Sequence, residues 1–338
     1  MESRVSSPAM PYNNSMRVSL VMPTLNGGEL LERVLNGIDR QPGAMELERI
    51  AIDSGSNDDT VERLTAHGFT VHGVDQREFN HGSTRDLGIS KTSGDVIVLL
   101  TQDAVPTDEE WLQRLVTAYE DPSVAAAYCR QIPREDCNPL IRHRILEWTA
   151  SKTERVVQRL EGDPMAAFEA LDPMARLRTC AYDNVAGSVR RSTWEEMPFG
   201  HRRFGEDVAF GKRVILSGRS IVYEPRSPVI HSHNRSPKAE GKRIFCDHEN
   251  LRDLFDVHLM PTYEHYKNAV TSGQKEFRRI LDALDLPADQ RSHWEKWADQ
   301  YAKWSALGIY LGGNARRFRR GVHGLWFGFV ERHLRKGI

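Results

Sequence analysis

The chain has 338 residues and a formal net charge of −1; 39% of the residues are hydrophobic and 28% are charged. This balance is that of a globular protein with one large or two modest domains, and the near-zero charge argues against a nucleic-acid-binding protein. The four cysteines form no CxxC pair, so neither a zinc ribbon nor a disulfide framework is indicated, and free thiols in a reducing cytosol are expected.

The N-terminal segment, residues 1–16, is small and polar and is expected to form a disordered leader. It lacks the apolar core of a signal peptide. The longest apolar stretches, such as Val96 to Leu100, are far shorter than the roughly 20 residues that a membrane-spanning helix needs. The sequence therefore predicts a cytoplasmic protein.

Short apolar runs alternate with amphipathic segments over the first hundred residues. Strands are expected over 17–22, 48–52, 69–74 and 95–100, and helices over 29–37, 60–67 and 84–92. This alternation predicts a mostly parallel sheet covered by helices on both faces. In such a sheet, the ligand site lies at the carboxyl ends of the strands.

The expected strand ends carry polar and turn-forming residues. The first strand is followed by PTLNGG (23–28), the second by Asp53 and the fourth by Asp103. Two carboxylates at one sheet edge suggest a site, although aspartates also serve as helix caps and turn formers. Neither GxGxxG nor GxxxxGK[ST] occurs. A divalent cation held by carboxylates is therefore the simplest way to neutralise the phosphates of any bound nucleotide.

The second half of the chain offers a further group of candidates. Glu206 and Asp207 begin an expected helix over 206–216, where an acidic pair either complements the helix dipole or acts in catalysis. His231 and His233 end an apolar run, and imidazole is a natural ligand for Mn²⁺-type ions. Because side chains alternate along an extended segment, the two imidazoles are expected on opposite faces, and His231 is favoured as the ligand.

The last part, 236–338, is patterned as helices, expected over 244–259, 263–270, 274–284 and 292–307. Its end, 314–338, mixes arginines with aromatic and aliphatic side chains. Such a basic, amphipathic end contacts an anionic membrane surface, docks on the rest of the protein, or forms a dimer contact.

Four segments together resemble a known family. PTLNGG (23–28), IDSGSNDDT (52–60), FNHGSTRDLGI (79–89) and VLLTQDAVP (98–106) are similar to the nucleotide-binding half of inverting family 2 glycosyltransferases, which have the GT-A fold. The segments FNHGSTR and LLTQDA resemble bacterial rhamnosyltransferases more closely still, and the similarity continues through 204–233. The resemblance implies an α/β GT-A domain over 17–235, with a nucleotide-binding half over 17–106 and an acceptor half over 107–235. A C-terminal helical extension over 236–338 follows.

The resemblance also implies a donor site. Thr24 and Asp53 would line the base pocket, with the Asp53 carboxylate accepting the imide N–H of uracil or thymine. Arg85 would reach the base or its neighbouring aspartate. Thr101 stands where the family's DxD motif has its first aspartate, a form that rhamnosyltransferase-like members share. The other implied donor-binding residues are Pro23, Asn26, Ser54, His81 and Gln102.

The metal and acceptor sites follow from the same resemblance. Asp103, matching the last carboxylate of DxD, would bind Mn²⁺ or Mg²⁺ on the diphosphate together with His231. Asp207, matching the aspartate of the ED motif, would be the catalytic base, with Glu206 the next candidate. The acceptor-side wall would include Gly187, Ser188 and Trp194. Trp194 is otherwise a core residue.

The loop 200–205 holds Arg202 and Arg203, which either close over the diphosphate or form a solvated charge pair. The implied reaction is inverting transfer of a sugar, with L-rhamnose from dTDP-L-rhamnose favoured, to a glycan or lipid-linked acceptor. The alternatives are a different UDP- or dTDP-sugar donor and a non-catalytic glycan-binding protein. A sugar-phosphate nucleotidyltransferase would want a GxGxRxxP-type first loop, which PTLNGG lacks.

Overall fold

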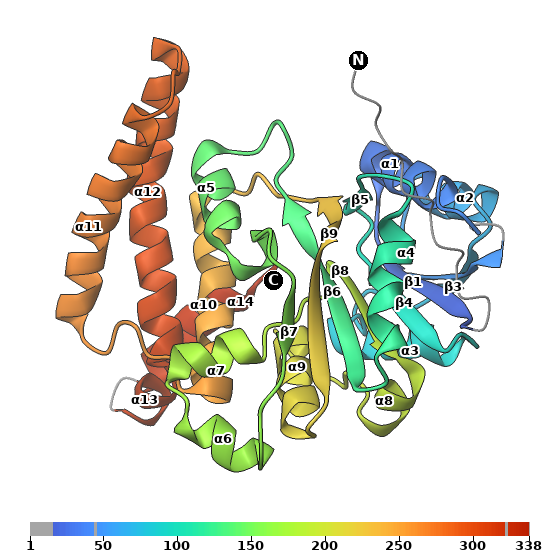
Figure 1. The fold of residues 1–338 in the computed structure, drawn as a ribbon. Coiled ribbons are helices and arrows are strands. Elements are labelled where there is room, and N and C mark those ends of the chain that lie inside the picture. The colour runs from blue at the N-terminus through green and yellow to red at the C-terminus, as the bar shows by residue number, and fades with distance from the viewer. Residues whose placement is uncertain (1–15, 44–45, 322–323, 338) are drawn as a thin grey trace, which may run out of the picture.

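The computed structural model describes residues 16–43, 46–321 and 324–337, so the expected leader, apart from Met16, lies outside the described residues. Across these residues the chain builds a nine-stranded mixed sheet in the order β3-β2-β1-β4-β8-β6-β9-β5, with β7 paired to β9 (Figure 1). Its strands are β1 (Val18–Thr24), β2 (Glu48–Asp53), β3 (Thr70–Gly73), β4 (Val96–Leu100), β5 (Val105–Pro106), β6 (Val124–Ile132), β7 (Val156–Gln158), β8 (Ala186–Arg190) and β9 (Ser220–Ile230).

The expected mostly parallel sheet is confirmed. Strands β3, β2, β1 and β4 are parallel to one another, and β6 is parallel to β9. Strand β8 runs antiparallel between β4 and β6, and β5 and β7 run antiparallel to β9. The carboxyl ends of β1, β2, β4, β6 and β9 therefore meet at one edge of the sheet.

Helices cover both faces of the sheet because the central strands are apolar on both sides. Every residue of β4 is buried. Val96, Val98 and Leu100 pack in one core with helices α1 and α4, whereas Ile97 and Leu99 pack in another with α3 and α9. The helices of this part are α1 (Gly28–Asp39), α2 (Thr60–Ala66), α3 (His81–Ser90), α4 (Trp111–Val116), η2 (Thr117–Glu120), α5 (Pro139–Glu147), η3 (Thr149–Ser151), α6 (Pro164–Ala170), α7 (Pro173–Thr179), α8 (Arg191–Glu196) and α9 (Glu206–Leu216).

Helix α3 begins three residues earlier than the sequence pattern predicts. The side chain of Asn80 accepts hydrogen bonds from the backbone N–H groups of Gly82 and Ser83, each at 3.2 Å. This cap satisfies amides of the first turn that would otherwise lack partners. The helix therefore starts at His81 rather than at Thr84.

The C-terminal region is helical, as expected, and forms a layer beside the part of the chain that holds the sheet (Figure 1). Helices α10 and α12 approach closely at glycines: a Cβ on Gly308 would lie 2.5 Å from the carbonyl oxygen of Gly241. Ile141 of α5 shares an apolar cluster with Ile244 and Tyr301 of this layer. The helices are α10 (Pro237–Phe255), α11 (Tyr263–Asp282), α12 (Ala288–Gly313), α13 (Ala315–Arg320) and α14 (Gly324–Arg335).

Three further sequence predictions can be compared with the structure. Residues 263–284, expected as two helices, contain the single helix α11. The four cysteines are free and buried. Among the described residues, no helix has both the length and the apolar character that crossing a bilayer requires.

Candidate active site

Strand pairing brings three possible metal ligands together at the carboxyl edge of the sheet. Asp103 follows β4, and His231 and His233 follow β9. Antiparallel pairing of β5 with β9 sets Val105 opposite Ile230. Continued outward, this register brings Asp103 to the segment that carries both histidines.

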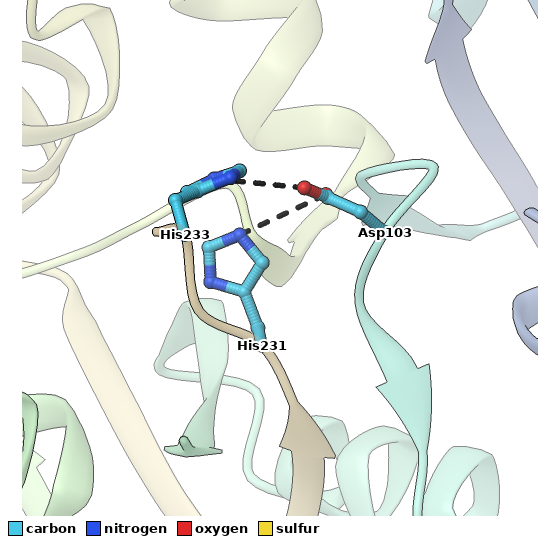
Figure 2. A group of neighbouring side chains, drawn as sticks. All are labelled: Asp103, His231 and His233. Atoms are coloured by element: carbon cyan, nitrogen blue, oxygen red, sulfur yellow. Dashed lines mark ion pairs between the residues drawn. The ribbon is translucent and has the colours of Figure 1, made fainter. Parts of the chain in front are cut away.

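The two imidazoles face the same carboxylate (Figure 2). His231 Nε2 lies 3.7 Å from Asp103 Oδ1, and His233 Nε2 lies 3.5 Å from Asp103 Oδ2. The expectation that the two histidines point to opposite faces is wrong, because the strand ends at Ile230 and alternation ends with it. Their rings instead lie edge to face, with centroids 4.7 Å apart.

This donor set fits a divalent metal ion. The ligand atoms of the three side chains lie within 4.8 Å of one another. Burial lowers the pKa of His231 and, together with the neighbouring His231, that of His233. Both rings are therefore neutral at pH 7 and offer nitrogen lone pairs toward a carboxylate, and two imidazoles with one carboxylate suit Mn²⁺-type ions.

Gln131 of β6 determines which nitrogen of His231 is free. Its Nε2 donates to Asp183 Oδ2 at 3.0 Å, and because a carboxylate accepts, the amide oxygen must point the other way. That oxygen lies 2.9 Å from His231 Nδ1. Nδ1 therefore carries the proton, and the Nε2 lone pair faces Asp103. Gln131 was not among the residues predicted from the sequence, because its contact with His231 results from the pairing of β6 with β9.

Asp183 and Asp207 line one cavity of about 160 Å³. Burial raises the pKa of Asp183 to about 6. Burial and then the charge of Glu206 raise the pKa of Asp207 well above its usual value. Asp207 lies in the first turn of α9, so its carboxylate sits where a helix dipole favours negative charge while burial disfavours it. A raised pKa suits a general base.

Glu206 and Arg85 have partners that differ from those expected. Arg85 Nη1 donates to Glu206 Oε1 at 2.8 Å, and both side chains are buried. A second hydrogen bond from Arg85 goes to the carbonyl oxygen of His81. Arg85 therefore contacts Glu206 rather than Asp53, and Glu206 is engaged in an ion pair between α3 and α9.

The Asp53 carboxylate holds its own turn together. Its Oδ1 accepts from the hydroxyls of Thr24 at 3.1 Å and Ser56 at 2.5 Å. Its Oδ2 accepts from the backbone N–H groups of Gly55 at 3.0 Å and Ser56 at 2.9 Å. These four bonds use the acceptor positions of the carboxylate. A base imide would have to displace one of the hydroxyls.

Thr101 and Gln102 form hydrogen bonds that join the loops around the site. The side-chain amide of Gln102 pairs with the backbone of Leu25, accepting at 2.8 Å and donating at 2.9 Å. The Thr101 hydroxyl donates to the carbonyl oxygen of Val185. These bonds join the loop after β4 to the loop after β1 and to the start of β8.

The other expected donor residues lie along the same edge. Asn26 is exposed, with a φ of 46°, and its side-chain oxygen accepts from the N–H of Asn57. Ser54 is buried, and its hydroxyl donates to the carbonyl oxygen of Thr24. Pro23 is half-buried at the end of β1, and His81 is exposed at the start of α3.

The three expected acceptor residues have structural roles instead. Trp194 Nε1 donates to Asp86 at 2.7 Å, and the ring packs against the core, as its alternative interpretation held. Ser188 is buried within β8 and accepts from the Tyr119 hydroxyl. Gly187 is paired within the sheet on both sides. Both Gly187 and Ser188 are buried within the sheet.

The arginines of the loop before α9 are not equivalent. Arg202 Nε donates to Asn250 of α10 at 2.9 Å and to the carbonyl oxygen of Phe204 at 3.1 Å. Arg202 is thus a tether between the loop and the helical layer, which neither interpretation anticipated. Arg203 is exposed.

Comparison with known proteins gives the family. The family model described as Glycosyl transferase family 2 matches residues 19–172. The O-antigen chain rhamnosyltransferase RfbN of Salmonella typhimurium is 34% identical over 234 residues, which are 68% of this chain and 71% of that protein. The chain belongs to glycosyl transferase family 2.

Two further similarities concern this family 2 chain. The O-antigen chain rhamnosyltransferase WbaN of Salmonella anatum is 29% identical over 67% of this chain and 70% of that protein. The structure of glucosyl-3-phosphoglycerate synthase from Mycobacterium tuberculosis in complex with Mn²⁺, UDP-glucose and phosphoglyceric acid has a TM-score of 0.51 at 20% identity. It covers 75% of this chain and 86% of that one. The expected family and the GT-A fold are confirmed.

Proposed function

We propose that this family 2 glycosyltransferase moves a sugar from a nucleoside-diphosphate donor to a hydroxyl group with inversion, using a metal ion. The observation that carries the proposal is the cluster of Asp103, His231 and His233 at the carboxyl edge of the sheet. The same edge carries the turn held by Asp53. A diphosphate needs concentrated positive charge, and the first turn offers no glycine-rich cradle for it.

Asp103, His231 and His233 would hold the ion. Mn²⁺ fits them better than Mg²⁺, because Mg²⁺ prefers an all-oxygen octahedron and two of these ligands are nitrogens. When bound, the ion would stabilise the charge that develops on the departing diphosphate.

Asp207 is the proposed base. The acceptor oxygen forms a bond to the anomeric carbon as the bond from that carbon to the diphosphate breaks, and the hydroxyl proton passes to the Asp207 carboxylate. The raised pKa of Asp207 supports this role, because a carboxylate with a raised pKa is a stronger base. Glu206 is less suited, since its carboxylate is paired with Arg85.

L-Rhamnose from dTDP-L-rhamnose is the proposed donor, and a glycan or lipid-linked sugar is the proposed acceptor. The support is similarity: the relatives at 34% and 29% identity are O-antigen chain rhamnosyltransferases. Donor chemistry is consistent with this, because a pocket that packs the methyl group of a 6-deoxy sugar has no partner for an added hydroxyl. An unpaired buried hydroxyl costs about 1–3 kcal/mol.

A donor panel tests the proposal. Thermal shift and donor hydrolysis are measured with dTDP-L-rhamnose, UDP-glucose, UDP-galactose and UDP-N-acetylglucosamine, each with Mn²⁺, with Mg²⁺ and with EDTA. We expect the largest shift with dTDP-L-rhamnose and Mn²⁺, its loss in Asp103→Ala, and its retention in Asp207→Asn, which should lose transfer. A larger shift with another donor contradicts the rhamnose assignment, and full activity in EDTA contradicts the metal.

We also propose that α14 contacts an anionic membrane surface on the cytoplasmic side. Leu325, Trp326 and Phe329, here called the α14 patch, are 91%, 63% and 68% exposed. The Arg332 guanidinium lies 4.5 Å from the centroid of the Phe329 ring. Apolar side chains flanked by arginine are the composition of helices that lie in a membrane interface.

A further inference from the structure

One wall of the cavity beside Asp207 is formed by a residue that has no role in the proposed reaction. It lies between β6, the segment joining α5 to η3, α7 and the start of α9. Tyr128 of β6 lines it and is 1% exposed, yet among the described residues its hydroxyl has no hydrogen-bond partner. A buried unpartnered hydroxyl costs free energy unless something else satisfies it.

The neighbouring tyrosine shows what a structural hydroxyl looks like here. The ring of Tyr223 lies 5.1 Å from that of Tyr128, and its hydroxyl donates to the carbonyl oxygen of Lys152 at 2.5 Å. Burial raises the pKa of both tyrosines. Tyr128, which lines the cavity, therefore keeps a protonated hydroxyl that can both donate and accept.

The rest of the lining defines the chemistry of an occupant. Asp183 and Asp207 supply carboxylate oxygens, whereas Leu177 and Ala150 supply apolar surface. Asp183 accepts hydrogen bonds from the Gln131 side chain and from the backbone N–H groups of Val185 and Ala186, so three of the four acceptor positions of its carboxylate are used and one remains for a hydroxyl donor. Two carboxylates repel an anionic ligand and accept from hydroxyl donors.

Trp148 gives the cavity a flat apolar face. It follows the last residue of α5, lines the cavity, and is 47% exposed. The volume of about 160 Å³ is below the roughly 300 Å³ at which pockets for whole drug-sized ligands begin. The cavity suits one ring rather than a whole oligosaccharide.

We propose that this cavity binds a neutral pyranose ring of the acceptor, with Tyr128 and Asp183 bonding its hydroxyls and Trp148 covering its apolar face. The inference rests on the proposed function, because an acceptor hydroxyl must reach Asp207. It names a subsite formed by Tyr128, Trp148 and Asp183. It also excludes uronic acids and phosphorylated sugars from that position.

Saturation-transfer NMR with methyl glycosides tests the subsite without turnover. The full-length protein, with dTDP and Mg²⁺, is mixed with the methyl glycosides of rhamnose, mannose, glucose and galactose, and with methyl glucuronide. We expect a signal from at least one neutral glycoside and none from the glucuronide. Trp148→Ala should abolish the signal, and Tyr128→Phe should weaken binding about 2- to 10-fold, the worth of one hydrogen bond.

Tyr223→Phe is the matched control, since it removes a neighbouring hydroxyl that already has a partner. It should lower the melting temperature and leave glycoside binding unchanged, whereas Tyr128→Phe should leave the melting temperature unchanged or raised. No signal from any neutral glycoside, or equal signals in wild type, Trp148→Ala and Tyr128→Phe, overturns the subsite. Failure of the glycosyltransferase proposal is separate, because it would appear as no hydrolysis of any nucleotide sugar.

Discussion

The proposed metal ligand His231 is oriented by a residue outside the proposed metal cluster. Gln131 accepts a hydrogen bond from His231 Nδ1 and donates one to Asp183, so the glutamine links the proposed metal cluster to the proposed acceptor cavity. Partners behind a metal-ligating histidine fix its tautomer and orientation. Gln131 is therefore a positioning residue.

Removing that partner should weaken metal binding. We expect Gln131→Leu to lower Mn²⁺ affinity about 10- to 100-fold, measured by titration calorimetry or by the EPR signal of free Mn²⁺. Gln158→Leu is the control, since Gln158 is a buried glutamine whose side-chain amide donates to the backbone carbonyl oxygens of Arg178, Thr179 and Ala181. Equal affinities in Gln131→Leu and Gln158→Leu would leave Gln131 with only a structural role.

Asp183 should make stability depend on pH. Its folded-state pKa of about 6 exceeds the usual value of 3.8, so the folded state binds more protons between these values. The free energy of unfolding therefore falls as pH rises through this window and levels off above it. In Asp183→Asn this dependence disappears. From about pH 5 to about pH 7.5, urea unfolding should show wild type losing roughly 1 kcal/mol relative to the variant. Parallel curves would contradict the raised pKa.

At this scale, the sequence allowed the metal cluster to be predicted in part. Asp103 and His231 follow apolar runs, and that position marks the end of a strand. His233 was set aside on an alternation that stops at Ile230. Gln131, Asp183 and Tyr128 could not be found, because their roles depend on which strands pair and on which hydroxyl lacks a partner.

Helices α3 and α9 are joined by the buried pair of Arg85 and Glu206. The backbone of α3 also lies directly against the loop before α9, since a Cβ on Gly82 would lie 2.0 Å from the carbonyl oxygen of Gly200. This contact fixes the first turn of α9, which carries Asp207. A surface pair of similar length would contribute little, whereas breaking a buried pair leaves an uncompensated charge.

A double-mutant cycle tests this joint. We expect Arg85→Leu to lower the free energy of unfolding by about 3–5 kcal/mol, and Arg85→Leu with Glu206→Leu to recover much of that loss, measured by urea unfolding. Arg77→Ala, which breaks an exposed pair with Asp75, is the control and should leave the midpoint unchanged. Additive losses in the double variant would show that the two side chains do not act as a pair.

Among the elements, helices with strong periodicity were predicted best. Helix α9 has the expected bounds, Glu206–Leu216. Strand β8 was not predicted, because its residues AGSVR lack the aliphatic run that marked β4, and its antiparallel direction is set by the strands on both sides. The misplaced acceptor residues Gly187 and Ser188 follow from that omission.

Two arginines of the basic C-terminal segment form ion pairs with glutamates of α10 and α14. Arg319 and Arg335 pair with Glu249 and Glu331, and Phe327 is buried against α10. Docking on the rest of the protein is thus one role of this segment. The α14 patch remains on the outside.

Vesicle co-sedimentation tests the membrane contact. We expect binding to vesicles that contain phosphatidylglycerol but not to pure phosphatidylcholine vesicles, with binding reduced at high salt and lost in Trp326→Ser with Phe329→Ser. The control is Val156→Ser with Met165→Ser, which removes exposed apolar side chains from β7 and α6. Equal binding by both double variants would refute a role for the patch.

The hydrogen bond from Arg202 to Asn250 has a consequence for hybrids made by recombining related genes. It ties the loop before α9 to helix α10, and the histidines lie within a few residues of the start of that helix. Recombination at residue 236 between the genes of two related enzymes would take Arg202 from one parent and Asn250 from the other. Hybrid enzymes joined there should therefore lose stability when the two parents differ at residue 202 or 250.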